Sequence, residues 1–102
     1  MYQVIKRDGQ IADFSIQKIT AAITKAFEAT HKQYHPSVIE LLALHVTSDF
    51  ESKIKDGRIT VEEIQDSVEK VLSESGYADV AKAYILYRKQ KLQHGKILFF
   101  PI

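Results

Sequence analysis

Residues 2–14, YQVIKRDGQIADF, decide how the N-terminus of this chain folds. Asp8-Gly9 lies between two short runs in which apolar and polar residues alternate, and this pattern is typical of a tight β-hairpin. Glycine adopts a positive φ angle without steric cost, so Gly9 suits the turn. The stretch therefore predicts an N-terminal β-hairpin.

Three cations gather around this hairpin. Lys6 and Arg7 precede the turn, and Ser15 is a suitable N-cap for a helix that begins at Ile16 and carries Lys18 in its first turn. Like charges repel one another and the N-terminus of a helix is itself positive, so a bound anion would relieve both costs. The cluster predicts a polyphosphate site, although a basic hairpin whose charges are simply solvated explains the same residues.

Length and composition narrow the function classes. The chain has 102 residues, of which 45% are hydrophobic, and this fits one domain. Lys and Arg number 14 against 13 Asp and Glu, so the sequence does not favour a general nucleic-acid-binding surface. There is no cysteine, which excludes disulfides, cysteine zinc sites and thiol catalysis. No run of about 18 apolar residues occurs, so no membrane span is expected. The N-terminus begins with a strand pattern instead of a charged segment followed by an apolar run, so no signal peptide is expected either, and a cytoplasmic location is the simplest interpretation.

Two helices are predicted directly after the hairpin. Apolar periodicity favours a helix over residues 16–30 and another from Pro36 to near Lys55, and Pro36 suits the first position of a helix. The residues predicted to share the apolar face of this second helix are Val38, Leu41, Leu42, His45, Val46 and Phe50.

Two further helices are predicted in the second half of the chain. A short strand is expected at Arg58-Ile59, and Thr60 has the spacing to Glu63 of a capping box that begins the third helix. Ser75-Gly76 ends that helix, and the fourth helix follows and becomes strongly basic near its end. Residues 95–102 are too apolar for a free tail, so we expect them to pack against another surface.

The sequence offers no catalytic site and no metal site. No nucleophile is paired with a base, and no glycine-rich loop ends in Lys-Ser or Lys-Thr. His31 and His35 have helical spacing, but no carboxylate follows them at the interval of a metal ligand. A binding function is therefore expected in place of catalysis.

The chain resembles an ATP-cone domain from Tyr2 to about Lys91. The stretches that carry the resemblance are Val4-Ile5-Lys6-Arg7-Asp8-Gly9, Phe14-Ser15, Lys18-Ile19, Ile59 to Glu69, and Ala81 to Arg88. The resemblance implies an α+β fold that is mostly α, a four-helix bundle capped by a small three-stranded β-sheet that includes the N-terminal hairpin. Residues 1–92 would form the cone, and residues 93–102 would form an apolar tail that leads into a following domain or docks elsewhere.

ATP-cone domains control the activity of ribonucleotide reductases, so the resemblance implies a regulatory and non-catalytic role. ATP in the cone permits activity, and dATP inhibits the enzyme by changing how its subunits assemble. ATP or dATP is therefore the expected effector, with Mg²⁺ accompanying the triphosphate, and reductase subunits or other copies of the domain are the expected partners. The alternative is an ATP- and dATP-sensing module of a transcriptional regulator of reductase genes, but such repressors place a cysteine zinc ribbon before the cone and this chain has no cysteine.

The resemblance also implies a set of nucleotide-binding residues. Lys6, Arg7, Lys18 and Lys89 match positions that contact the phosphates or line the pocket, and the backbone of Val4 would meet the adenine. The full expected set is Val4, Lys6, Arg7, Ser15, Lys18, Ile19, Thr60, Gln65 and Lys89.

Three positions depart from the pattern of the reductase large subunits. Ala12 stands where an acidic residue often reads adenine, so Asp13, Ser15 or the backbone alone would have to take that task. Gln65 replaces a histidine that lies near the nucleotide in those subunits. Thr60 is a helix cap, a ligand contact or both. The resemblance therefore specifies the phosphate positions more closely than the base positions.

Overall fold

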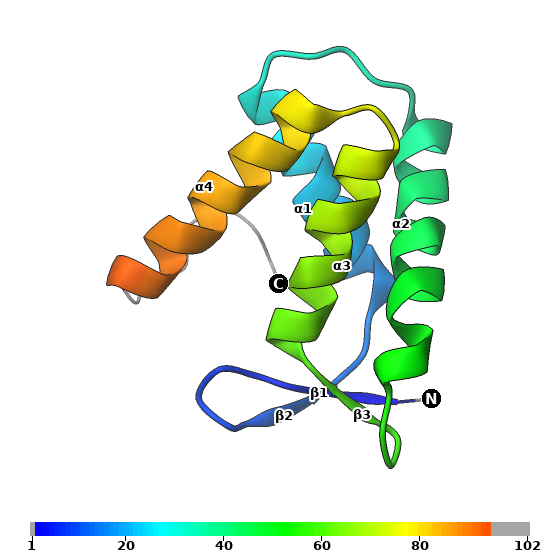
Figure 1. Ribbon diagram of the computed structural model, residues 1–102, viewed down its shortest axis with the longest axis vertical. Helices are drawn as coiled ribbons and strands as arrows, with labels where there is room; N and C mark the ends of the chain where they lie inside the picture. The colour runs from blue at the N-terminus through cyan, green and yellow to red at the C-terminus, as the bar shows by residue number, and fades with distance from the viewer. Residues whose placement is uncertain (1, 95–102) are drawn as a thin grey trace.

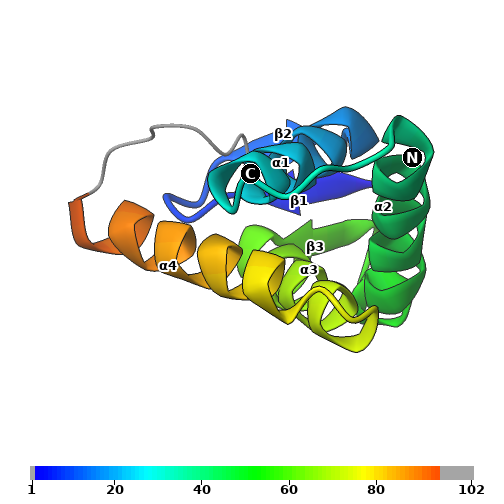
Figure 2. The same cartoon turned by 90° about the horizontal axis from the view of Figure 1, so that it is seen from above.

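The computed structural model describes residues 2–94 of the chain and the side chains of residues 2–89. Four α-helices stand on one side of a three-stranded sheet (Figure 1): α1 (Ile16–Ala29), α2 (Pro36–Phe50), α3 (Val61–Glu74) and α4 (Ala78–His94). Seen from above, α2 and the C-terminal half of α4 lie on opposite sides of the molecule (Figure 2). This architecture confirms the predicted α+β fold, a four-helix bundle capped by a small sheet. The apolar tail expected at residues 95–102 lies outside the described residues.

The sheet is built around its first strand. β1 (Gln3–Ile5) lies in the centre, antiparallel to β2 (Ile11–Asp13) and parallel to β3 (Arg58–Thr60). Because both edges of β1 are paired, its backbone groups are already used by the sheet.

The hairpin between β1 and β2 forms as predicted. The Lys6 amide donates to the Gln10 carbonyl at 2.8 Å, and the Gly9 amide donates to the Lys6 carbonyl at 2.9 Å. Gly9 has a φ of +87°, the left-handed conformation that a three-residue hairpin loop requires at this position. The Asp8 carboxylate accepts from the Gln10 amide at 3.0 Å and closes the turn. The loop therefore fixes the direction in which Lys6 and Arg7 leave β1.

The parallel pairing of β1 with β3 places the start of α3 beside the hairpin. Ile5 is in register with Thr60, so β1 and β3 both end at the same edge of the sheet. Thr60 ends β3 and caps α3: its hydroxyl accepts from the Glu63 amide at 3.2 Å, and the Glu63 carboxylate accepts from the Thr60 amide at 3.1 Å. The predicted capping box is confirmed, and it holds the first turn of α3 at this edge.

The helices bury a continuous apolar core, and the buried face of α2 agrees only in part with the predicted one. Leu42, Val46 and Phe50 are buried as predicted. Leu41 is 53% exposed and His45 is exposed, whereas Ile39 and Ala43 are buried. Apolar residues occur on more than one side of this helix, so periodicity alone did not select the side that packs against α1 and α3. The buried residues of α2 are Ile39, Leu42, Ala43, Val46 and Phe50.

The end of α2 differs from the prediction, and an aromatic cluster lies beside it. The regular α2 helix ends at Phe50, earlier than the predicted Lys55, and continues as a 3₁₀ turn, η1 (Glu51–Lys53). Tyr2 and Phe14 pack on Phe50, with ring centroids 6.0 Å and 5.8 Å away, and on each other at 4.6 Å. This aromatic cluster joins the sheet to the bundle and fixes the distance between them. Within the described residues, no helix is both long enough and apolar enough to span a membrane.

Candidate functional site

A pocket lies where the hairpin meets the first turns of α1 and α3. Its volume is about 430 Å³, including the part open to solvent. Three elements converge on it because Phe14 and Ser15 connect β2 directly to α1, while β3 continues directly into α3. The residues that line the pocket are Val4, Lys6, Ala12, Asp13, Phe14, Ser15, Lys18, Ile19, Val61 and Ile64.

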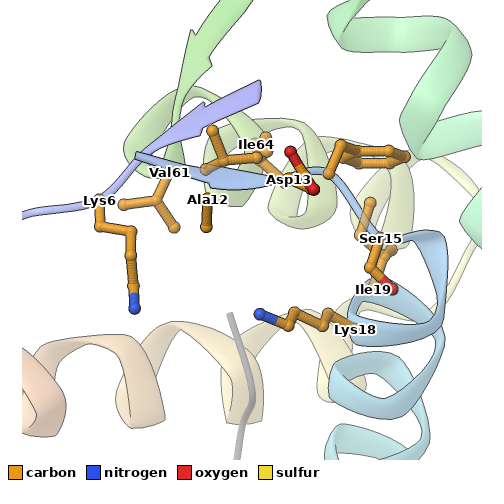
Figure 3. A pocket seen from close by; sticks show the side chains of 10 residues that line it. Lys6, Ala12, Asp13, Ser15, Lys18, Ile19, Val61 and Ile64 are labelled. Atoms are coloured by element: carbon orange, nitrogen blue, oxygen red, sulfur yellow. The ribbon is translucent and has the colours of Figure 1, made fainter. Parts of the chain in front are cut away.

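Two lysines frame the opening of the pocket. Figure 3 shows the amino groups of Lys6 and Lys18 approaching it from opposite sides, one from the end of β1 and one from the first turn of α1. Both residues are exposed, and neither forms an ion pair within the described side chains. Two ammonium groups that face one opening without an acidic partner raise the local positive potential and favour an anion with several charges.

The interior of the pocket is apolar. Val4 comes from β1, Ile19 from α1, and Val61 and Ile64 come from the first turn of α3. Ile19, Val61 and Ile64 also belong to the buried residues of the fold, so the wall they form is fixed by packing. Apolar walls with a few polar groups at the opening are typical of small-molecule sites, and here they suit a flat base with a phosphate chain at the entrance.

Asp13 is the acidic group of this pocket. It is exposed and lies on β2, in register with Gln3 of β1. A carboxylate repels phosphates and accepts hydrogen bonds. Asp13 therefore suits a hydrogen-bond donor of a ligand, whereas the two lysines suit its phosphates. Ala12 contributes only a methyl group to the same wall.

Arg7 does not line the pocket and contacts α3. Its Nε lies 3.0 Å from Glu62 Oε2, and its Nη2 donates to Gln65 Oε1 at 2.6 Å. The structure thus pairs two of the expected site residues, Arg7 and Gln65, beside the pocket and outside its lining. Neither contact was predicted, because it joins residues more than 50 positions apart in the chain.

Ser15 and Thr60 have different local roles. Ser15 occupies the N-cap position of α1 as predicted, but its hydroxyl donates to Gln17 Oε1 at 3.0 Å and makes no cap hydrogen bond. Ser15 still lines the pocket, whereas Thr60 is engaged in the capping box and the pocket is lined by its neighbour Val61.

Arg88 and Lys89, two neighbouring basic residues of α4, have different surroundings. Arg88 donates hydrogen bonds to Asp66 and Glu69 of α3, and to the backbone carbonyl of Glu62 at 3.3 Å. Burial opposes the charged form, but the hydrogen bonds to Glu69 and Asp66 outweigh it and raise the pKa of Arg88. Lys89 is exposed and does not line the pocket.

The structure therefore brings together five of the nine expected site residues, namely Val4, Lys6, Ser15, Lys18 and Ile19. Sequence reasoning missed Phe14 as a lining residue, and it also missed Val61 and Ile64. The available signal for these two was their place in the first turn of a helix that begins directly after a strand. Within the described residues, no group of three or more His, Asp or Glu side chains is placed to hold a metal ion.

Comparison with known proteins shows similarity to parts of several ribonucleotide reductases. The chain is similar to the ribonucleoside-diphosphate reductase subunit alpha of Chlamydia pneumoniae, with 46% identity over 96% of this chain and 11% of the relative. It is 43% identical to the vitamin B12-dependent ribonucleoside-diphosphate reductase of Thermoplasma acidophilum over 87% of this chain and 12% of that protein. It is 37% identical to the anaerobic ribonucleoside-triphosphate reductase of Haemophilus influenzae over 88% of this chain and 12% of that protein. The chain thus spans about a tenth of the length of these relatives. The ATP cone domain family matches residues 2–93, so this chain belongs to the ATP-cone family.

Proposed function

We propose that this chain is an allosteric domain that binds ATP and dATP in the pocket between the hairpin, α1 and α3. The observation that carries the proposal is the pair of lysines, Lys6 and Lys18, at the opening of an apolar pocket. Their amino groups bind the phosphates, because charge-assisted hydrogen bonds to phosphate oxygens are the strong ones in proteins. Membership of the ATP-cone family supports the same ligand.

The base occupies the apolar part of the pocket. Val4 belongs to the central strand, whose backbone is paired on both edges, so the proposal assigns the contact with the base to its side chain. Ile19 forms the opposing wall, and Ser15 and Asp13 are the polar groups available to the base and sugar. Asp13 takes the acceptor role that Ala12 cannot provide.

Additional cations assist from outside the lining. In the proposal, Arg7 reaches the phosphates from beside the pocket, together with Gln65, which holds the guanidinium in place. Lys89 belongs to α4, which runs below the Lys6 and Lys18 amino groups in Figure 3. Mg²⁺ binds to the triphosphate itself, and Thr60 acts as the cap of α3.

The relatives support a regulatory role for the bound nucleotide. Because they are named as ribonucleotide reductases, we propose that ATP permits and dATP inhibits the activity of such an enzyme, in the cytoplasm. A ligand changes assembly only if it binds one arrangement better than another, so ATP and dATP must favour different contacts with reductase subunits or with other copies of this domain. The chain itself has no catalytic role in this proposal.

Isothermal titration calorimetry tests the binding site. ATP and dATP should compete for one site, and Lys6→Ala or Lys18→Ala should each weaken binding about tenfold or more, because a charge-assisted hydrogen bond contributes roughly 1.5–3 kcal/mol. Lys25→Ala is the matched control, since Lys25 is also an exposed lysine of α1 but does not line the pocket. Unchanged affinity in both pocket variants, or an equal loss in the control, would reject this site.

A further inference from the structure

Arg7 lies at the boundary between the pocket and α3. Its sequence neighbour Lys6 lines the pocket, as does Val61, the neighbour of its partner Glu62. Arg7 and Glu62 thus each adjoin, in the sequence, a residue that lines the pocket. The Arg7 side chain is 24% exposed, so it is not sealed from solvent.

The Glu62 carboxylate already serves this guanidinium as an anion. It lies 3.0 Å from the Arg7 Nε, in the first turn of α3, where the helix dipole also favours a negative charge. It is not required for the helix cap, because Thr60 and Glu63 form that. Arg88 contacts the backbone carbonyl of Glu62, whereas the Glu62 carboxylate pairs with Arg7.

The ion pair is weak enough to be exchanged. Glu62 is 45% exposed, and solvent-exposed ion pairs contribute little because water screens them. A triphosphate carries several negative charges and is held independently by Lys6 and Lys18, so it can replace a single carboxylate on Arg7.

We propose that Glu62 is an internal competitor of the nucleotide, whose carboxylate occupies the Arg7 guanidinium and is displaced by a phosphate when the pocket fills. The inference rests on the proposed function and adds a regulatory step to the same site. The exchange frees Glu62 from the tip of the hairpin, while Gln65 keeps its hydrogen bond to Arg7. Occupancy of the pocket would then change how the hairpin is attached to the first turn of α3.

A double-mutant cycle tests the exchange. ATP affinity is measured by calorimetry for the full chain and for Glu62→Gln, Arg7→Gln and the double variant. Glu62→Gln should tighten binding about two- to fivefold, the range expected for removal of an exposed ion pair. The same substitution should give no gain in the Arg7→Gln background, because the competition requires Arg7.

Asp66→Asn is the matched control for a general charge effect. Asp66 lies one turn further along α3, also exposed, but it pairs with Arg88. Its removal should change ATP affinity less than Glu62→Gln does, and thermal melting should show all variants folded. If Glu62→Gln leaves the affinity unchanged, or tightens binding equally with Arg7 absent, the competitor role is wrong while the proposed function stands. If the unmodified chain binds no ATP or dATP, the proposed function itself is wrong and the competitor role falls with it.

Discussion

Lys6 and Arg7 are neighbours in the chain, yet the structure gives them opposite environments. Lys6 points to the pocket opening and forms no ion pair within the described side chains, whereas Arg7 is held by Glu62 and Gln65 of α3. The basic end of α4 repeats the contrast, since Arg88 is bound to acidic residues of α3 and Lys89 is exposed. Arg7 and Arg88 thus attach the hairpin and α4 to α3, whereas their neighbours Lys6 and Lys89 remain available to a ligand.

Cations with and without an acidic partner differ in how readily they can bind a ligand. A cation without an acidic partner costs little to recruit, because no existing interaction must be broken. A cation that is already paired contributes to binding only after its partner is displaced, so part of its interaction with a ligand offsets that loss. Lys6 and Lys18 should therefore dominate affinity, and Arg88 should dominate stability.

The largest expected effect concerns ATP binding by Lys6 and Lys18. The double variant Lys6→Ala/Lys18→Ala should lose about a hundredfold in ATP affinity if the two contacts add, while its free energy of unfolding should stay within about 0.5 kcal/mol of the unmodified chain. Calorimetry and urea denaturation measure the two quantities. A large loss of stability with little loss of affinity would reverse the assignment.

The next effect concerns the contribution of Arg88 to stability. Arg88→Gln should lower the free energy of unfolding by about 1–2 kcal/mol, between the values for exposed and buried ion pairs, because the Arg88 side chain is 16% exposed and the variant leaves Glu69 without its guanidinium. Lys82→Gln, at an exposed position of the same helix, is the control and should change stability by less than about 0.5 kcal/mol. Urea denaturation that shows equal stability for the two variants would remove Arg88 from the stabilising group.

A smaller effect concerns Thr60 at the end of β3, and it distinguishes a role in stability from a role in nucleotide binding. Thr60→Ala should cost about 1 kcal/mol of stability through loss of the capping box, with ATP affinity unchanged. Ser73→Ala, at an exposed position near the end of α3, should change neither quantity. A clear loss of affinity in a folded Thr60→Ala protein would show that this residue contacts the nucleotide as well.

Much of the fold could be predicted because its signals are local. The Asp8-Gly9 turn, Pro36 at the start of α2, and Thr60 with Glu63 at the start of α3 each depend on residues within a few positions. The face of α2 was predicted less well, because several apolar residues occur on different sides and only packing against the other helices decides which are buried. Leu41 is therefore exposed where Leu42 is buried.

The site could be predicted only in part for the same physical reason. Lys6 and Lys18 belong to one continuous stretch, hairpin followed by helix, and the structure places both at the same pocket. Val61 reaches that pocket only because β1 and β3 pair in parallel across more than 50 residues, and the Arg7 contacts with α3 depend on the same pairing. No short sequence pattern encodes such a contact.

A crystal structure of the chain with dATP would show whether the two lysines bind the phosphates. We expect the phosphates within hydrogen-bond distance of the Lys6 and Lys18 amino groups, with the base against Val4 and Ile19. A nucleotide bound elsewhere, for example at the hollow between α2 and α3 lined by His45, Asp49 and Glu74, would contradict this expectation.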